Sequence, residues 1–211
     1  MKIEYIDHFG SDLMVVNAAR VSFNKWHAHF EPSDEKLISY LAREGHWSPF
    51  SHPQIQFRIS VPIFVARQWF KHTVGTARNE VSRRYVDDSP DFFFPDMWRK
   101  RPEGNAKQGS SSDGIDEQMM AYEILEDVIQ TTEAAYNRLL ELGVCPEQAR
   151  MVLPQNMYTS WIETGSLYYW ARVCNLRLDI HAQKEIRQAV LEIHRKVSGL
   201  FPISMTALVK V

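Results

Sequence analysis

The sequence has few cysteines, almost no net charge and no long apolar segment. Its two cysteines, Cys145 and Cys174, form neither a disulfide framework nor a metal-ligand spacing. No apolar run approaches the roughly 20 residues that cross a bilayer, and the opening stretch, MKIEYIDHFG, lacks the apolar core of a secretory signal. We therefore expect a cytoplasmic protein without membrane association.

The formal charge of −2 over 211 residues argues against a general nucleic-acid coat, because such proteins are basic overall. Eight histidines raise the question of a metal site, but the closest pair, His27 and His29, has no HExxH or CxxC motif with it. Hydrophobic residues at 45% and charged residues at 24% are ordinary globular values. The composition predicts one domain, residues 1–211, with no metal and no nucleic-acid partner.

Hydrophobic periodicity predicts helices with a few strands among them. The clearest strand is residues 54–60, where Ile55, Phe57 and Ile59 face one way and polar residues face the other. Further strands are expected over 2–6 and 155–162, and helices over 12–21, 33–43 (with Ser33 as N-cap and Gly45 as the stop), 62–71, 115–142, 146–153, 166–176 and 181–200. Strands without a regular βαβ rhythm indicate the α+β class. Residues 99–114, rich in Gly, Ser and charge, are expected to form a flexible excursion.

Basic residues are concentrated in one stretch, RQWFKHTVGTARNEVSRRY, residues 67–85. It holds five Lys or Arg residues and a single acid, Glu80. The predicted helix would deliver Lys71 and His72 into a loop, and Arg83 and Arg84 present the planar fork that suits phosphate or carboxylate. The pattern by itself leaves three interpretations: an anion pocket, a solvated helix face, or a strip that binds a nucleic-acid backbone.

The residue order in this stretch resembles the signature of the flavin-dependent thymidylate synthases, in which an RHR triplet is followed by a serine within NExSxRY. Other blocks of that family follow in order: NAARVSF, EGHWSPFSH, PIFVARQWF, CPEQARMVLPQNMYTSW and NLRLDIHAQKEIR. The triplet departs from the family pattern, because it reads Lys71, His72 and Thr73, with one extra residue between His72 and Ser82. Lys71 keeps a positive charge without the guanidinium fork, and Thr73 has no charge.

The resemblance implies an antiparallel sheet surrounded by helices, in a homotetramer whose active sites are shared between subunits. It implies synthesis of dTMP from dUMP, with methylenetetrahydrofolate as one-carbon donor and NADPH-reduced FAD as hydride source. The altered triplet motivates an alternative on the same fold, which is flavin- and folate-dependent hydroxymethylation of a pyrimidine deoxynucleotide. An unrelated alternative is a nucleic-acid-binding module that uses the basic stretch.

The resemblance also assigns site residues position by position. Arg177 matches the arginine that contacts the pyrimidine ring and favours ionisation at N3, so it is the expected catalytic residue, and Arg84 and Arg150 are the best candidates for the dUMP phosphate. The full dUMP set is Gln68, Lys71, Glu80, Ser82, Arg83, Arg84, Arg150 and Arg177. The FAD set is His46, Ser48, Lys71, His72, Thr73, Glu80, Ser166 and Arg172.

Cysteine and aromatic residues have simpler interpretations. Neither cysteine lies in the Pro-Cys-His setting of the ordinary thymidylate synthase, so both are expected to be core thiols. Trp47, between His46 and Ser48, is expected near a ligand, whereas the pattern leaves His181 open between a helix cap and a site role. Three further tryptophans are expected in the core: Trp69, Trp161 and Trp170.

Overall fold

The computed structural model describes residues 1–86, 88–102 and 109–210, which form two compact units. The larger unit comprises Lys2–Ile59, Lys71–Asn79 and Ile162–Val211. The smaller unit comprises Met1, Ser60–Phe70 and Glu80–Trp161.

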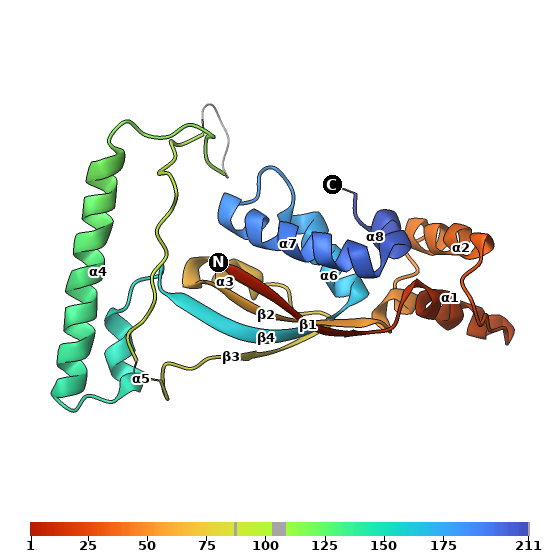
Figure 1. Ribbon diagram of the computed structural model, residues 1–211, viewed down its shortest axis with the longest axis horizontal. Coiled ribbons are helices and arrows are strands. Elements are labelled where there is room, and N and C mark those ends of the chain that lie inside the picture. The colour runs from red at the N-terminus through yellow and green to blue at the C-terminus, as the bar shows by residue number, and fades with distance from the viewer. Residues whose placement is uncertain (87, 103–108, 211) are drawn as a thin grey trace. The chain divides into compact units, whose positions relative to one another are not determined.

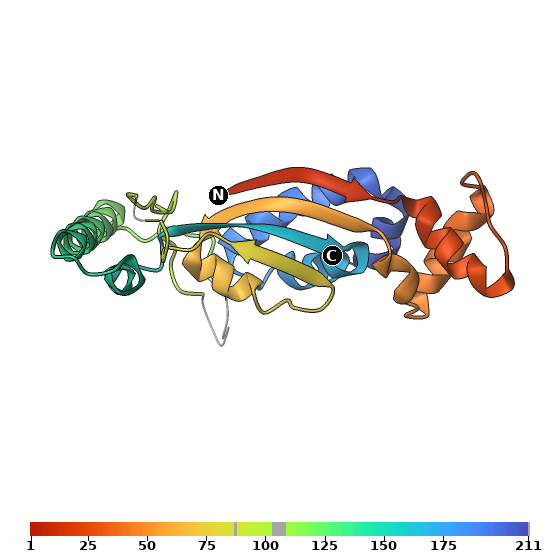
Figure 2. The same cartoon turned by 90° about the horizontal axis from the view of Figure 1, so that it is seen from below.

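A four-stranded sheet has the order β1-β2-β4-β3, and its neighbouring strands run antiparallel (Figure 2). The strands are β1 (Lys2–Phe9), β2 (Gln54–Pro62), β3 (Thr76–Glu80) and β4 (Tyr158–Ser166). Side chains alternate along a strand, and in β2 Ile55, Phe57 and Ile59 are fully buried while Arg58 is exposed. The sheet therefore has one apolar face, as the alternation predicted.

Helices of the larger unit cover this apolar face. The helices are α1 (Asp12–Arg20), α2 (Pro32–Arg43), α6 (Leu167–Arg177), α7 (Lys184–Leu200) and α8 (Pro202–Leu208). Figure 1 shows α6 and α7 lying along the sheet, with α7 packed against β1. The buried indole of Trp170 donates to the backbone oxygen of Ile55 at 3.1 Å and meets the Phe57 ring edge to face at 5.1 Å. The core of this unit thus lies between sheet and helices, and the predicted α+β class is confirmed.

The smaller unit contains α3 (Ile63–Trp69), α4 (Gln118–Glu141) and α5 (Pro146–Ala149). The first turn of α3 is tied to the segment before β4, because the N–H of Ile63 donates to the carbonyl of Met157 at 2.9 Å. Trp161 meets the rings of Trp69 and Phe70 edge to face at 5.7 and 4.9 Å. The three tryptophans expected in the core are all buried, so that prediction is confirmed.

The start of α2 corrects one prediction. Glu31, not Ser33, is the N-cap, and Pro32 occupies the first helical position. Pro is favoured there because its missing N–H would have no helical partner. The Asp34 carboxylate then accepts from the Glu31 N–H at 2.9 Å, as in a capping box. Gly45 follows the helix with φ of 73°, in agreement with its predicted place beyond the end.

Several predicted bounds were also wrong. β4 covers Tyr158–Ser166 instead of 155–162, α3 ends at Trp69 instead of about residue 71, and neither β3 nor α8 was predicted. The sequence of β3, TARNE, contains residues that seldom favour strands, and the strand forms through its pairing with β4. Strand β4 continues through Glu163 because that buried carboxylate finds tertiary partners, which a local pattern does not reveal.

The predicted excursion at 99–114 is only partly described, since residues 103–108 lie outside the described residues. Its two arms pair with each other: Arg99 bridges to Gly114, and the N–H of Lys100 donates to the carbonyl of Asp113 at 2.9 Å.

No helix in the described part of the chain is long and apolar enough to cross a membrane. Over the same residues, no group of three or more His, Cys, Asp or Glu side chains could hold a metal ion.

Candidate active site

A cavity of about 540 Å³ in the smaller unit gathers most of the basic residues that follow β3. The chain is fixed at this point because the N–H of Val81 donates to the carbonyl of Ser160 at 2.9 Å. Arg150, at the start of a short 3-10 helix (Arg150–Val152), contributes another guanidinium. The polar lining consists of Glu80, Ser82, Arg83, Arg84, Arg150 and Thr159, and the apolar lining includes Ile63, Met151, Leu153 and Met157.

The arginines of this cavity differ in their partners. Arg83 donates to the Asp88 carboxylate at 3.2 Å, so its charge is partly neutralised. Arg84 donates through Nε to the Ser82 hydroxyl at 3.2 Å, and Arg150 donates to the carbonyl of Glu147 at 3.2 Å. Because these two arginines bond to neutral oxygens, each keeps a positive charge with which to bind an anion. The cavity therefore suits a phosphate at Arg84 and Arg150.

Glu80 lies at the side of the same cavity. Its carboxylate accepts a hydrogen bond from the Thr159 hydroxyl at 2.6 Å. Thr159 is itself buried on β4, so this bond holds the Glu80 side chain in place. A fixed carboxylate next to three arginines can accept hydrogen bonds from the N–H groups of a nucleobase or from sugar hydroxyls.

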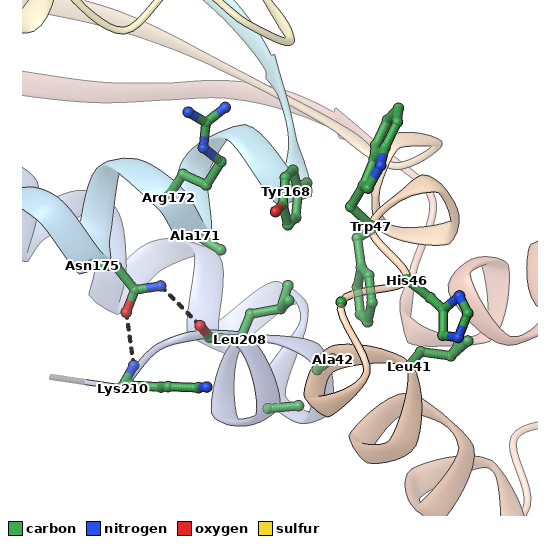
Figure 3. A pocket seen from close by; sticks show the side chains of 13 residues that line it. Leu41, Ala42, His46, Trp47, Tyr168, Ala171, Arg172, Asn175, Leu208 and Lys210 are labelled. Carbon is green, nitrogen blue, oxygen red and sulfur yellow. Dashed lines mark hydrogen bonds between the residues drawn. The ribbon is translucent and has the colours of Figure 1, made fainter.

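A second pocket, of about 220 Å³, lies in the larger unit (Figure 3). His46 and Trp47 come from the segment after α2, and Tyr168 and Arg172 come from α6. The rings of Trp47 and Tyr168 lie 6.1 Å apart, and the Arg172 guanidinium lies 6.0 Å from the Tyr168 ring centroid. Trp47 is 55% exposed, and its place near a ligand stays a prediction.

The far wall of this pocket comes from the C-terminal segment. Asn175 holds that segment, since its amide nitrogen donates to the carbonyl of Leu208 and its amide oxygen accepts from the N–H of Lys210, both at 2.8 Å. Lys210 and Arg172 are two cations facing a pocket that also has aromatic surfaces. Such a set fits a ligand that combines phosphates with planar rings, which is the chemistry of FAD.

His72 and Arg177 form the third feature, also in the larger unit. Arg177 is the last residue of α6, and its Nε donates to His72 Nε2 at 2.9 Å. An imidazole that accepts at Nε2 must be neutral. Burial, followed by the charges of Arg177, Arg78 and Arg172, lowers the pKa of His72 to about 4, which keeps the ring neutral at pH 7.

The loop that carries His72 is tied down at Gly75. The carbonyl of Gly75 accepts from the N–H of Ser166 at 2.9 Å. Gly75 has φ of 86°, and a Cβ built on it would lie 3.0 Å from the Ser166 hydroxyl oxygen. That oxygen also caps α6, because it accepts from the Tyr169 N–H at 3.1 Å. The buried Ser166 thus anchors the loop.

The structure brings together some of the predicted site residues and leaves others apart. Five of the dUMP set share the cavity of the smaller unit, while His46 and Arg172 share the pocket of the larger unit. Gln68 is half-buried on α3, and Lys71, Thr73 and Ser48 are exposed. No ligand role is tested by these positions, so each stays a prediction.

Other site features were missed or misjudged. Tyr168 lies four residues before Arg172 on α6, so helical spacing could have linked them, whereas nothing local pointed to Lys210.

Cys174 is buried, and burial raises its pKa to about 12, as expected of a core thiol. Cys145 is exposed, so the prediction of a core thiol there was wrong. It is the N-cap of α5, a position at the end of a helix, where side chains meet solvent.

Comparison with known proteins identifies the family. The family model for the thymidylate synthase complementing protein matches residues 4–203. Flavin-dependent thymidylate synthases from Thermosipho africanus and Thermus thermophilus are 37% and 39% identical, over 99% and 97% of this chain and 90% and 74% of theirs. The crystal structure of the UMP/dUMP methylase PolB from Streptomyces cacaoi, bound with 5-Br dUMP, superposes with a TM-score of 0.87 at 29% identity, over 98% of this chain and 93% of that one. The chain belongs to the thymidylate synthase complementing protein family, the flavin-dependent thymidylate synthases.

Proposed function

We propose that this enzyme converts dUMP to dTMP, with residues 1–211 acting as one catalytic domain. The observation that supports this best is the cavity of the smaller unit, where Ser82, Arg84 and Arg150 meet next to the fixed carboxylate of Glu80. Two guanidiniums suit the 5′-phosphate, and a carboxylate suits the N–H or hydroxyl groups of a nucleoside. The nucleotide specificity of the structural relative, PolB, supports a pyrimidine monophosphate as substrate.

Arg177 is the residue that we assign to activation of the pyrimidine. The family's chemistry joins a one-carbon unit to C5 of the uracil ring, and C5 becomes nucleophilic when negative charge develops on that ring through ionisation at N3. A guanidinium that bonds the ring stabilises this charge without gaining or losing a proton. The bond from Arg177 Nε to His72 Nε2, at 2.9 Å, orients the guanidinium plane.

The pocket of the larger unit is the proposed FAD site. Arg172 and Lys210 would bind the phosphates, and Trp47 and Tyr168 would pack against planar rings. When bound, FAD supplies the hydride that it receives from NADPH, and methylenetetrahydrofolate supplies the carbon. The other predicted FAD residues lie in three places. Lys71 and Thr73 flank His72, Ser166 is the N-cap of α6, and Ser48 follows Trp47.

We further propose that the protein acts in the cytoplasm as a homotetramer that shares its active sites between subunits, with no nucleic-acid partner. The family resemblance supports the tetramer, and the formal charge of −2 agrees with a small nucleotide as the partner.

Gln68 on α3 and Lys71 after it complete the proposed dUMP contacts.

Product analysis tests the proposed reaction. Purified protein is incubated with dUMP, FAD, NADPH and methylenetetrahydrofolate, and the nucleotides are measured by mass spectrometry, with UMP and dCMP as parallel substrates. We expect dTMP, formed only when FAD and NADPH are both present. The names of the curated relatives favour methylation over the hydroxymethylation alternative. A 5-hydroxymethylated product without dTMP would overturn the proposal in favour of that alternative.

A further inference from the structure

Arg78 and Glu163 form an ion pair next to His72, in the larger unit. Arg78 lies on β3 and Glu163 on β4, and Arg78 Nε donates to Glu163 Oε1 at 2.9 Å. The Glu163 side chain is fully buried, and that of Arg78 is 17% exposed. Neither residue belongs to the ligand sets that the family resemblance implied. Removing both charged side chains from water is energetically costly, so a buried ion pair of this kind indicates a role other than stability.

The Glu163 carboxylate is fixed by three donors from two elements, α6 and β3. The Tyr169 hydroxyl, on α6, donates to Oε1 at 2.5 Å. The Thr76 hydroxyl, on β3, donates to the same oxygen at 2.8 Å. Three donors on one buried carboxylate oxygen make it a rigid acceptor. Arg78 is therefore held in one orientation, because the guanidinium is planar and its donors have fixed directions.

That orientation aims Arg78 at the His72 loop. Its Nη2 donates to the backbone carbonyl of His72 and to the Tyr169 hydroxyl, the latter at 3.1 Å. The imidazole of His72 in turn accepts from Arg177 Nε at 2.9 Å. Hydrogen bonds thus join Glu163, through Arg78, to the His72 backbone, and the His72 side chain bonds the proposed catalytic arginine.

We propose that Arg78 and Glu163 are positioning residues, which fix the His72 backbone and thereby the hydrogen bond between His72 and Arg177. The role in turnover rests on the proposed function, whereas the effect on His72 does not. The proposal also gives the variant triplet a physical account. Thr73 provides no charge in the loop, and Arg78 brings a guanidinium to the same loop from the following strand.

The electrostatics of His72 agree with this assignment. The cations around it are Arg177 and Arg172 on α6 and Arg78 on β3, and with burial they lower its pKa to about 4. Removing one cation makes protonation of the ring easier. A protonated ring has no acceptor nitrogen left, so it cannot keep the bond from Arg177.

The test follows the titration of His72 in the full-length protein. Histidines are labelled with ¹³C at Cε1, and the His72 signal is assigned by its loss in His72→Gln. In the wild type we expect His72 to have a pKa of about 4. In Arg78→Gln we expect a rise of about one unit or more, with kcat for dTMP lowered roughly tenfold and KM for dUMP changed much less.

Two further variants separate position from charge. Glu163→Gln removes a negative charge, and by charge alone it should lower the pKa of His72 or leave it unchanged. If Glu163 instead holds Arg78 in place, the released guanidinium no longer holds the loop, and the pKa of His72 should rise. Arg78→Lys keeps the charge without the fork, so we expect a smaller pKa rise than in Arg78→Gln and a kcat between the two.

A matched ion pair in the same unit provides the control. Arg20 donates to Asp34 at 2.7 Å, and their side chains are 20% and 0% exposed, close to the values for Arg78 and Glu163. Arg20→Gln should cost similar stability and leave the His72 titration as in the wild type. Folded Arg78→Gln with an unchanged His72 titration would overturn the proposal. If Arg78→Gln does not fold, Tyr169→Phe, which removes one donor from Glu163, must give a smaller rise, and no rise would refute it.

The two proposals fail in different ways. Absence of dTMP from the wild-type reaction would refute the proposed function and leave the histidine titration unaffected. An unchanged His72 signal in the variants would refute only the role of Arg78 and Glu163.

Discussion

At the scale of the residue, Arg177 is the side chain on which the proposed chemistry depends. Its guanidinium is partly buried at the end of α6 and is oriented by a neutral histidine. Arg84 and Arg150, in the other unit, have a different proposed task, which is to bind the phosphate, and both donate to neutral oxygens. Three arginines of one chain are therefore distinguished by their hydrogen-bond partners.

Arg177→Ala is expected to lower kcat about 100-fold or more, as the loss of a donor to a developing oxyanion does in other enzymes. The fold and the bound flavin should be retained, because α6 is held by its buried face. Steady-state kinetics and the flavin absorbance of the variant measure both. Turnover close to wild type would contradict the role of Arg177.

Arg150→Ala and Arg84→Ala should each weaken dUMP binding by about 2 kcal/mol, roughly 30-fold, because a charge-assisted bond to phosphate is lost. Arg138→Ala is the matched control, since Arg138 lies on α4 of the same unit and pairs with Glu141 at the surface. Titration calorimetry with dUMP gives the affinities. Equal affinities in all three variants would place the phosphate elsewhere.

His72 makes stability depend on pH. Its pKa is lowered from 6.5 to about 4 in the folded chain, so between these values the unfolded chain binds a proton that the folded chain does not. Stability should therefore fall as the pH falls from 6.5 to 4, by on the order of 1 kcal/mol after solvent screening of this half-exposed ring. Urea unfolding of wild type and His72→Gln at pH 7 and 5 measures the effect. An equal loss in both proteins would contradict it.

At the scale of the element, much of the fold was predictable from local pattern. The alternation of Ile55, Phe57 and Ile59 gave β2, and apolar spacing gave the long helices. Strand β3 could not be predicted, because TARNE has no apolar alternation and pairs only through β4. The candidate site divides in the same way: the family resemblance pointed to Arg150 and, by its position before Arg177, to Arg172, whereas Lys210 and Glu163 are placed by tertiary contacts that no local pattern records.

The loop between α3 and β3 is the element whose conformation matters most to the site. Gly75→Ala should cost about 1–3 kcal/mol, because the residue has φ of 86° and its Cβ would lie 3.0 Å from Ser166 Oγ. Gly143→Ala is the control, with φ of 83° and open space around its Cβ. We expect both variants to lower the thermal unfolding temperature. Gly75→Ala should also reduce kcat, measured at a temperature where both variants are folded, whereas Gly143→Ala should leave kcat unchanged. Equal kcat values in the two variants would show that this loop does not need its glycine for turnover.

At the scale of the whole molecule, the cavity of the smaller unit is the proposed nucleotide site and the pocket of the larger unit is the proposed FAD site. Each feature has its own chemistry: guanidiniums and a fixed carboxylate in the first, aromatic rings and two cations in the second. Family membership joins them into one reaction. We therefore conclude that this chain is a flavoenzyme acting on a nucleotide.

The absorbance spectrum of the purified protein, reconstituted with FAD, tests this claim most directly. Under anaerobic conditions, we expect flavin bands that bleach on addition of NADPH and recover as dUMP and methylenetetrahydrofolate are converted to dTMP. His46→Ala and Arg172→Ala should each lower the amount of flavin that the protein retains. A protein that retains no flavin, or whose reduced flavin is not reoxidised by the two substrates, would show that this chain is not a flavin-dependent thymidylate synthase.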